Sequence, residues 1–191
     1  KVTLETMNDP SFGQALALPR VWWLDDNTAM VYDSRKPDSV RVLERLDPAT
    51  GKRTPMLDWP KARESVAKLF SDGKAPRVSP VPSAFSGSAT YGLYVVSGDL
   101  FVLDIPNSSF IRMTETPEEE KSVNFSPDGT KLAYVRGNNL YACDIVTKKE
   151  WQLTKDGTET LLNGTLSWVY WEEIFGRRDI GYWWSGDSKA I

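Results

Sequence analysis

Two stretches of this chain, GLYVVSGDLFVLDI (residues 92–105) and LAYVRGNNLYACDI (residues 132–145), align without a gap at a shift of 40 residues. At this shift Tyr94 falls on Tyr134, and both copies close on the same Asp-Ile pair. Each copy has the alternating pattern of two strands joined by a short turn. A period of about 40 residues is typical of a four-stranded propeller blade. The sequence therefore predicts an all-β fold built from such blades.

The repeat extends beyond these two stretches. Each copy is preceded by an aromatic residue and a turn, and the aromatic positions are Trp23, Phe85, Phe125 and Trp184. We expect these positions to begin equivalent strands of consecutive blades. A threonine recurs at the end of two copies, as Thr114 and Thr154. The pattern runs from about Val21 to the end of the chain, so it predicts about three four-stranded blades and the start of another.

Turn residues separate the predicted strands. In SPDG (residues 126–129) the proline presets the turn and Gly129 tolerates a positive φ. The GNN stretch at residues 137–139 predicts a hairpin turn between two strands.

Two insertions interrupt the period, and each predicts a short helix. The first covers residues 58–75 and begins DWPKARESVAKLF, where apolar spacing favours a helix of about ten residues with Pro60 near its start. The second is SWVYWEEIF, residues 167–175, about two helical turns long. Its aromatic residues recur at i, i+3 and i+7 and predict a face that is buried; they are Trp168, Trp171 and Phe175.

Adjacent carboxylates, Glu172 and Glu173, stand on this second helix. The simplest interpretation is a solvated face, with Glu173 paired to Arg177 at the ordinary i, i+4 spacing. The other interpretation is a cation site, because neighbouring carboxylates repel and a cation between them relieves that repulsion. A primary ammonium has three donors and suits such a pair.

Composition excludes several functions. Apolar residues make up 40% of the 191 residues, charged residues 26%, and the net charge is -3, so there is no basic field for nucleic acid. The sequence contains no histidine and no GxSxG elbow, which removes His-dependent catalysis, and the single cysteine, Cys143, is expected to fill a core. We expect no metal and no cofactor. No apolar run approaches the length of a membrane span.

The stretch SWVYWEEIF, followed by YWWS at residues 182–185, resembles a segment of the dipeptidyl peptidase IV family and its bacterial relatives, where a short helix interrupts a propeller blade. The resemblance implies that Glu172 and Glu173 bind the N-terminal ammonium of a peptide substrate. It also implies that residues 1–191 are the N-terminal part of an eight-bladed propeller. A catalytic α/β-hydrolase domain with a Ser-Asp-His triad, absent from this chain, would follow in the same polypeptide.

The whole protein would then be a serine exopeptidase that releases N-terminal di- or tripeptides, typically after proline. From the family we also expect export to the periplasm or the cell surface. The present chain would be inactive alone. An arc of about three blades leaves at least one strand edge unpaired, so we further expect self-association through that edge.

The sequence departs from the family pattern at some positions. The usual segment is close to DWVYEEE, whereas this chain has Ser167 in place of the aspartate and Trp171 in place of the first glutamate. The family often has an arginine in an earlier blade that contacts a substrate carbonyl, and we find no match for it between Tyr91 and Asp104. The alternative hypothesis is a non-catalytic binding module of the TolB-like kind, since the blade motif specifies a fold and not a function.

Overall fold

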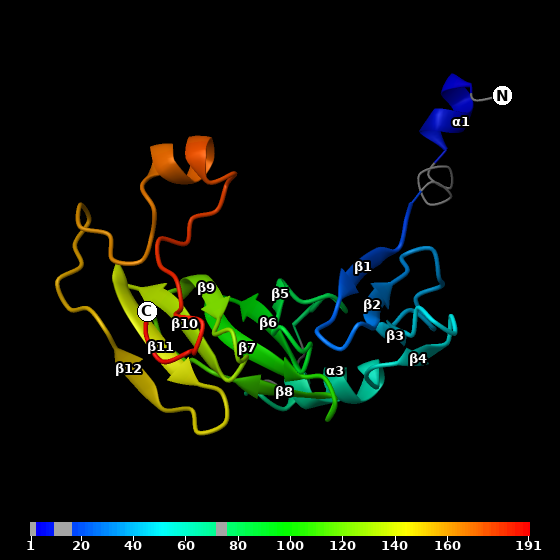
Figure 1. The fold of residues 1–191 in the computed structure, drawn as a ribbon, viewed down its shortest axis with the longest axis horizontal. Coiled ribbons are helices and arrows are strands. Elements are labelled where there is room, and N and C mark those ends of the chain that lie inside the picture. The colour runs from blue at the N-terminus through cyan, green and yellow to red at the C-terminus, as the bar shows by residue number, and fades with distance from the viewer. Residues whose placement is uncertain (1–2, 10–16, 72–75) are drawn as a thin grey trace.

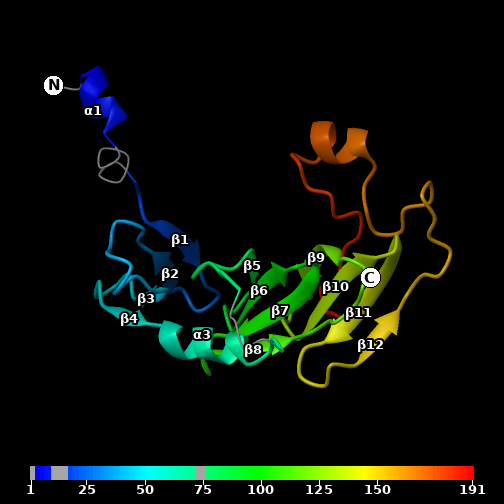
Figure 2. The same ribbon diagram turned by 180° about the vertical axis from the view of Figure 1, so that it is seen from behind.

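The computed structural model describes residues 3–9, 17–71 and 76–191. In these ranges three antiparallel four-stranded sheets follow one another in chain order along an open, curved row (Figure 1 and Figure 2). The first sheet contains β1 (Arg20–Trp23), β2 (Ala29–Tyr32), β3 (Glu44–Leu46) and β4 (Arg53–Pro55). The second contains β5 (Ala84–Phe85), β6 (Tyr91–Val96), β7 (Asp99–Asp104) and β8 (Ser109–Arg112). The third contains β9 (Lys121–Phe125), β10 (Lys131–Arg136), β11 (Asn139–Asp144) and β12 (Glu150–Gln152).

The helical elements are α1 (Leu4–Asn8), α3 (Trp59–Ala67) and a π-helical turn, η1 (Tyr170–Ile174). The predicted partial propeller of about three four-stranded blades is confirmed.

The pairing register repeats with the sequence. In the second sheet Tyr94 lies opposite Phe101, and in the third Tyr134 lies opposite Tyr141, which is the same pair one repeat later. The hairpin turns repeat as well, because both turn residues have a positive φ in each case: Ser97 and Gly98, then Gly137 and Asn138. Positive φ at both central residues matches the right-handed twist of the flanking strands.

One detail of the repeat was predicted wrongly. The aromatic residues Trp23, Phe85 and Phe125 are the last residues of β1, β5 and β9, and do not begin a strand. Trp184 lies outside the described strands. In the three sheets a turn follows the aromatic residue and leads into the second strand. The aromatic residue is therefore the end of the first strand of its blade.

The repeated threonines have a shared role at the end of each blade. The hydroxyl of Thr114 accepts a hydrogen bond from the amide of Leu100 at 2.8 Å, and the hydroxyl of Thr154 accepts one from the amide of Leu140 at 2.9 Å. The threonine hydroxyl therefore satisfies a backbone donor beyond the point where the last strand has ended.

Successive sheets are held face to face by apolar layers. Alternate residues of β7 point to opposite layers, so Phe101 packs toward the first sheet and Leu100 toward the third. The same alternation in β10 sends Tyr134 into the layer shared with the second sheet and Val135 into a third, smaller layer on the far face. Trp184 packs on this third layer. The fourth copy of the motif thus begins to cover the third sheet.

The turns of successive copies also touch one another. A Cβ on Gly129, whose φ is +71°, would lie 2.9 Å from the Cβ of Ser86 in the preceding copy. One copy later, the amide of Asp128 donates to the hydroxyl of Ser188 at 3.0 Å. A side chain larger than that of glycine would therefore separate neighbouring blades at this point.

Helix α3 confirms the first predicted insertion. Asp58 caps it by accepting from the amide of Lys61 at 3.0 Å, and Pro60 lies in the first turn. The helix packs against β8, and the amide of Phe110 donates to Ser65 Oγ at 2.8 Å. Within the described ranges, no helix is long and apolar enough to cross a membrane.

A buried polar network joins the second and third sheets. Glu120, 2% exposed, accepts hydrogen bonds from the hydroxyls of Thr114 at 2.6 Å and Thr116 at 2.7 Å, which follow β8. Arg136 on β10 approaches the same carboxylate at 3.4 Å and binds Glu150 on β12 at 2.8 Å. The network therefore gives the interface between the two sheets a charged element as well as an apolar one.

Each four-stranded sheet has two edge strands of its own. The open arc also exposes a sheet face, that of the third sheet. In the groove on the outer face of the third sheet, Leu153, which follows β12, is 47% exposed, and Ile191, on the segment across the groove, is 40% exposed. Such a face favours association. We therefore expect the purified chain to form dimers or larger species at high concentration, and Leu153→Lys to reduce them. Light scattering that gives a monomer mass throughout would contradict this.

Candidate functional site

The predicted carboxylate pair lies on η1, the π-helical turn that stands away from the three sheets (Figure 1). The amide of Phe175 donates to the carbonyl of Tyr170 at 2.9 Å, the five-residue spacing of a π turn. Gly176 and Arg177, with φ of 60° and 68°, end the turn. The second insertion is therefore helical as predicted, but it is wider than an α-helix. Single π turns are frequent at functional sites.

The buried aromatic face predicted for this helix is not present. No residue of η1 is buried, and Trp168 is 62% exposed. A π turn has more residues per turn than an α-helix, so the i, i+3, i+7 spacing, which marks one face at about 3.6 residues per turn, no longer does so. Phe175 still makes a tilted ring contact with Trp183, with centroids 6.5 Å apart.

The two carboxylates are available to a ligand. Glu172 is half-buried and Glu173 is exposed. In the part of the chain that the structure describes, neither has an ion-pair or side-chain hydrogen-bond partner, so the Glu173–Arg177 pair of the simplest interpretation is not formed. Arg177 and Arg178 follow the turn and are exposed. Adjacent carboxylates without a partner can accept several hydrogen bonds from a cationic donor.

A short stem carries η1. Thr165 and Ile180 form an isolated antiparallel bridge, and beside it the amide of Gly181 donates to the carbonyl of Gly164 at 2.9 Å. A third bond, 2.8 Å long, joins the amide of Leu166 to the carbonyl of Asp179. We call residues 164–181 the arm. Since its two ends are bonded to each other, η1 is presented at the tip of a closed loop.

Tyr182 fixes the base of the arm to the third sheet. Its side chain is 4% exposed, and its hydroxyl lies 2.7 Å from the carbonyl of Ser122 and 2.6 Å from that of Ala133. Burial raises the pKa of Tyr182 well above its ordinary value, so the hydroxyl remains a donor. The pairing of β9 with β10 shifts register here, and Ser122 has a φ of 52°. This β-bulge turns the Ser122 carbonyl toward the tyrosine.

A second bond at the bulge holds the stem. Ser122 Oγ donates to Asp179 Oδ2 at 2.8 Å. Gly164, with φ +84°, passes so close to the sheet that a Cβ there would lie 2.9 Å from Val135 Cγ2. The arm therefore has a defined root on β9 and β10.

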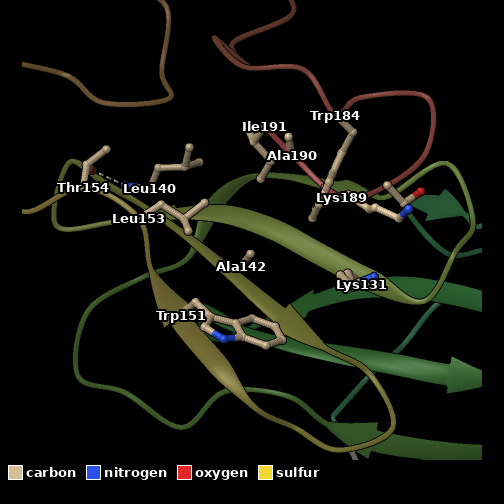
Figure 3. Close-up of a pocket in the computed structure, with 11 residues that line it drawn as sticks. Lys131, Leu140, Ala142, Trp151, Leu153, Thr154, Trp184, Lys189, Ala190 and Ile191 are labelled. Carbon is tan, nitrogen blue, oxygen red and sulfur yellow. Dashed lines mark hydrogen bonds between the residues drawn. The ribbon is translucent and has the colours of Figure 1, made fainter.

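A groove lies elsewhere, on the open face of the third sheet (Figure 3). It has a volume of about 680 Å³, and its floor includes Ala142 and Trp151 while Trp184 and Ile191 stand on the opposite side. The indole nitrogen of Trp184 is buried without a hydrogen-bond partner in the described chain. This groove does not include the glutamate pair, and it continues the apolar layering of the sheets.

The described residues offer little other chemistry. No three Cys, Asp or Glu side chains gather in these ranges to hold a metal ion. Cys143 packs in the second apolar layer as predicted, and burial raises the pKa of its thiol to about 12. Sequence reasoning missed Tyr182, Asp179 and Ser122, because their contacts join distant positions of the chain and depend on a bulge that has no sequence signal.

Comparison with known proteins places these features in a family. The model of the dipeptidyl peptidase IV (DPP IV) N-terminal region matches residues 86–191, which is more than half of the chain and includes the arm. The solved crystal structure of Porphyromonas gingivalis dipeptidyl peptidase 4 matches 98% of this chain and 26% of its own, with a TM-score of 0.67 and 22% sequence identity. At that identity the likeness concerns the fold.

Curated relatives agree with the family match. The chain is 36% identical to prolyl endopeptidase FAP of Bos taurus over 56% of its length, and 39% identical to dipeptidyl aminopeptidase B of Saccharomyces cerevisiae over 49%. It is 29% identical to dipeptidyl peptidase 4 of Trichophyton tonsurans over 88%. These alignments span 13%, 11% and 21% of the respective relatives, so the chain corresponds to a minor part of each of them.

Proposed function

The chain belongs to the dipeptidyl peptidase IV family, and from that premise we propose that it is the N-terminal part of the propeller domain of a serine exopeptidase. The whole protein would remove di- or tripeptides from the N-terminus of peptides, typically after proline. In this proposal Glu172 and Glu173 bind the ammonium group of the substrate.

The observation that carries the proposal is the state of the two glutamates. They are consecutive residues of a wide helical turn, have no partner within the described chain, and stand on an arm rooted in the third sheet. A substrate ammonium has three N–H donors, and two carboxylates offer enough acceptors for all of them. Anchoring one end of a peptide sets which carbonyl meets the nucleophile, so a fixed cleavage distance from the N-terminus follows.

The remaining parts of the mechanism belong to the rest of the protein. We propose that residues 1–191 form part of the propeller and that the catalytic α/β-hydrolase domain follows in the same polypeptide. The exposed side chains of η1 support a second domain beside the arm, since Ile174 is 62% and Tyr170 53% exposed. We further propose that the protein is exported to the periplasm or the cell surface, as expected from the family.

The direct test is an assay of the full-length protein. It should release the chromophore from Gly-Pro or Ala-Pro substrates that have a free N-terminus and should act poorly on the same substrates with an acetylated N-terminus. A full-length protein without peptidase activity and without a downstream Ser-Asp-His triad would favour the binding-module hypothesis.

The isolated 191-residue chain should not hydrolyse these substrates. It contains no histidine and no GxSxG elbow, so it lacks both the general base and the activated serine. The assay is colour release by the purified chain, followed through two chromatographic steps. Activity that coelutes with the chain through both would contradict the prediction.

A further inference from the structure

We infer that Tyr182 is a positioning residue of the ammonium site, an inference that rests on the proposed function and names what orients Glu172 and Glu173. The tyrosine does not contact the substrate in this account. It acts through the arm, whose base it fixes to β9 and β10.

The first argument is that the tip of the arm has few contacts to orient it. The residues of η1 are all at least partly exposed, and the turn lies away from the sheets (Figure 1 and Figure 2). The direction of such a segment is determined at its base, where backbone bonds close the stem. A small rotation at the base is enlarged at the tip, since η1 lies at the far end of the loop.

The second argument is that the base is built around one residue, Ser122. Its carbonyl accepts from Tyr182 and its hydroxyl donates to Asp179, so these two side-chain hydrogen bonds at the base of the arm meet at the bulge of β9. The Tyr182 hydroxyl also lies 2.6 Å from the carbonyl of Ala133 on β10. The phenol therefore ties the arm to two neighbouring strands at the position where their register shifts.

The consequence concerns substrate binding more than chemistry. Two carboxylates hold an ammonium well only when they stand within about 0.5 Å of the productive geometry. Loss of the tyrosine hydroxyl should leave the charges in place but let the arm move, so the affinity for the N-terminus falls while the catalytic groups are unchanged.

The test compares Tyr182→Phe with Tyr94→Phe in the full-length protein. Tyr94 is a matched control, because its side chain is 6% exposed and its hydroxyl donates to a backbone carbonyl, that of Ser79 at 3.0 Å, in a part of the second sheet remote from the arm. For Tyr182→Phe we expect KM for a free N-terminus to rise about threefold to tenfold, with kcat within about twofold and blocked substrates unaffected. Tyr94→Phe should leave KM unchanged.

A second measurement does not depend on activity. Hydrogen exchange at the amides of Leu166 and Gly181, which close the stem, should be faster in Tyr182→Phe than in Tyr94→Phe. If Glu172→Gln and Glu173→Gln leave the preference for a free N-terminus intact, the proposed function fails while the exchange result still decides whether Tyr182 anchors the arm.

Asp179→Ala gives an independent variant should Tyr182→Phe not fold. It removes the second connection to Ser122, so it should change KM and stem exchange in the same direction to a smaller extent. The inference is overturned if Tyr182→Phe, or Asp179→Ala in its place, matches Tyr94→Phe in KM and in exchange at the stem.

Discussion

Replacing Glu172 or Glu173 with glutamine in the full-length protein should lower kcat/KM for peptides with a free N-terminus by about tenfold to a hundredfold. Each substitution removes one charged acceptor from the proposed ammonium site, and a hydrogen bond to a charged group contributes about 1.5–3 kcal/mol. Neither carboxylate has a partner within the described chain. Each substitution therefore breaks no internal contact, and the fall in kcat/KM reports on substrate binding.

The design separates binding from folding. Peptides with a blocked N-terminus offer no ammonium, so they should be poor substrates of the wild type and should be little changed by either substitution. Glu159→Gln, an exposed glutamate before the arm, serves as the control for charge alone and should behave as the wild type. Equal losses on free and blocked peptides would mean that the pair maintains η1 and does not bind substrate.

Arg136→Ala should lower the free energy of unfolding by about 3 kcal/mol. Glu120 is 2% exposed and the side chain of Arg136 is 12% exposed, and breaking a buried ion pair typically costs about 3–5 kcal/mol. We expect the lower end because Glu150, the other partner, is 38% exposed and partly solvated. Urea unfolding at pH 7 measures the loss, and Arg178→Ala, an exposed arginine, should change stability by less than about 0.5 kcal/mol.

The effect of Arg136 should depend on pH. Burial raises the pKa of Glu150, but the hydrogen bonds from Arg136 and Tyr134 outweigh burial and leave that pKa below its ordinary value. A carboxylate whose pKa is lowered by folding stabilises the protein above its unfolded pKa, about 4.3, and loses that contribution as the pH falls through the folded value. The stability gap between wild type and Arg136→Ala should therefore narrow below about pH 4. If the stability difference between wild type and Arg136→Ala stays constant below about pH 4, the effect comes from packing of the guanidinium on Tyr141, whose ring centroid lies 4.2 Å from it.

The local repeat made most of the fold predictable. Strand pairing within one blade joins residues close in the chain, so the alignment of the two copies and the turn between their strands were enough to predict the hairpins, whose register the structure then gives as Tyr94 opposite Phe101 and Tyr134 opposite Tyr141. Helix α3 was likewise predictable, because its apolar spacing and Pro60 are local signals.

Contacts between blades were not predictable from this pattern. Glu120 is the last of three consecutive glutamates, residues of a type that is mostly exposed, yet it is buried by threonines of the preceding blade. The arm shows the same limit. Its glutamates could be located from SWVYWEEIF, whereas its π geometry and its attachment through Tyr182 depend on a bulge in a much earlier strand.

The shared apolar layers have a consequence for synthesis on the ribosome. Leu132 and Tyr134 complete the layer that Leu100 begins, so the face of one sheet stays uncovered until the next repeat has been made. At about 5–20 residues per second, a repeat of about 40 residues takes roughly 2–8 s to emerge. During each such interval the newest face is a binding surface for chaperones or for a neighbouring nascent chain. Rare codons placed within a repeat would lengthen that exposure, whereas a pause after a repeat has emerged would give the covered layer time to form.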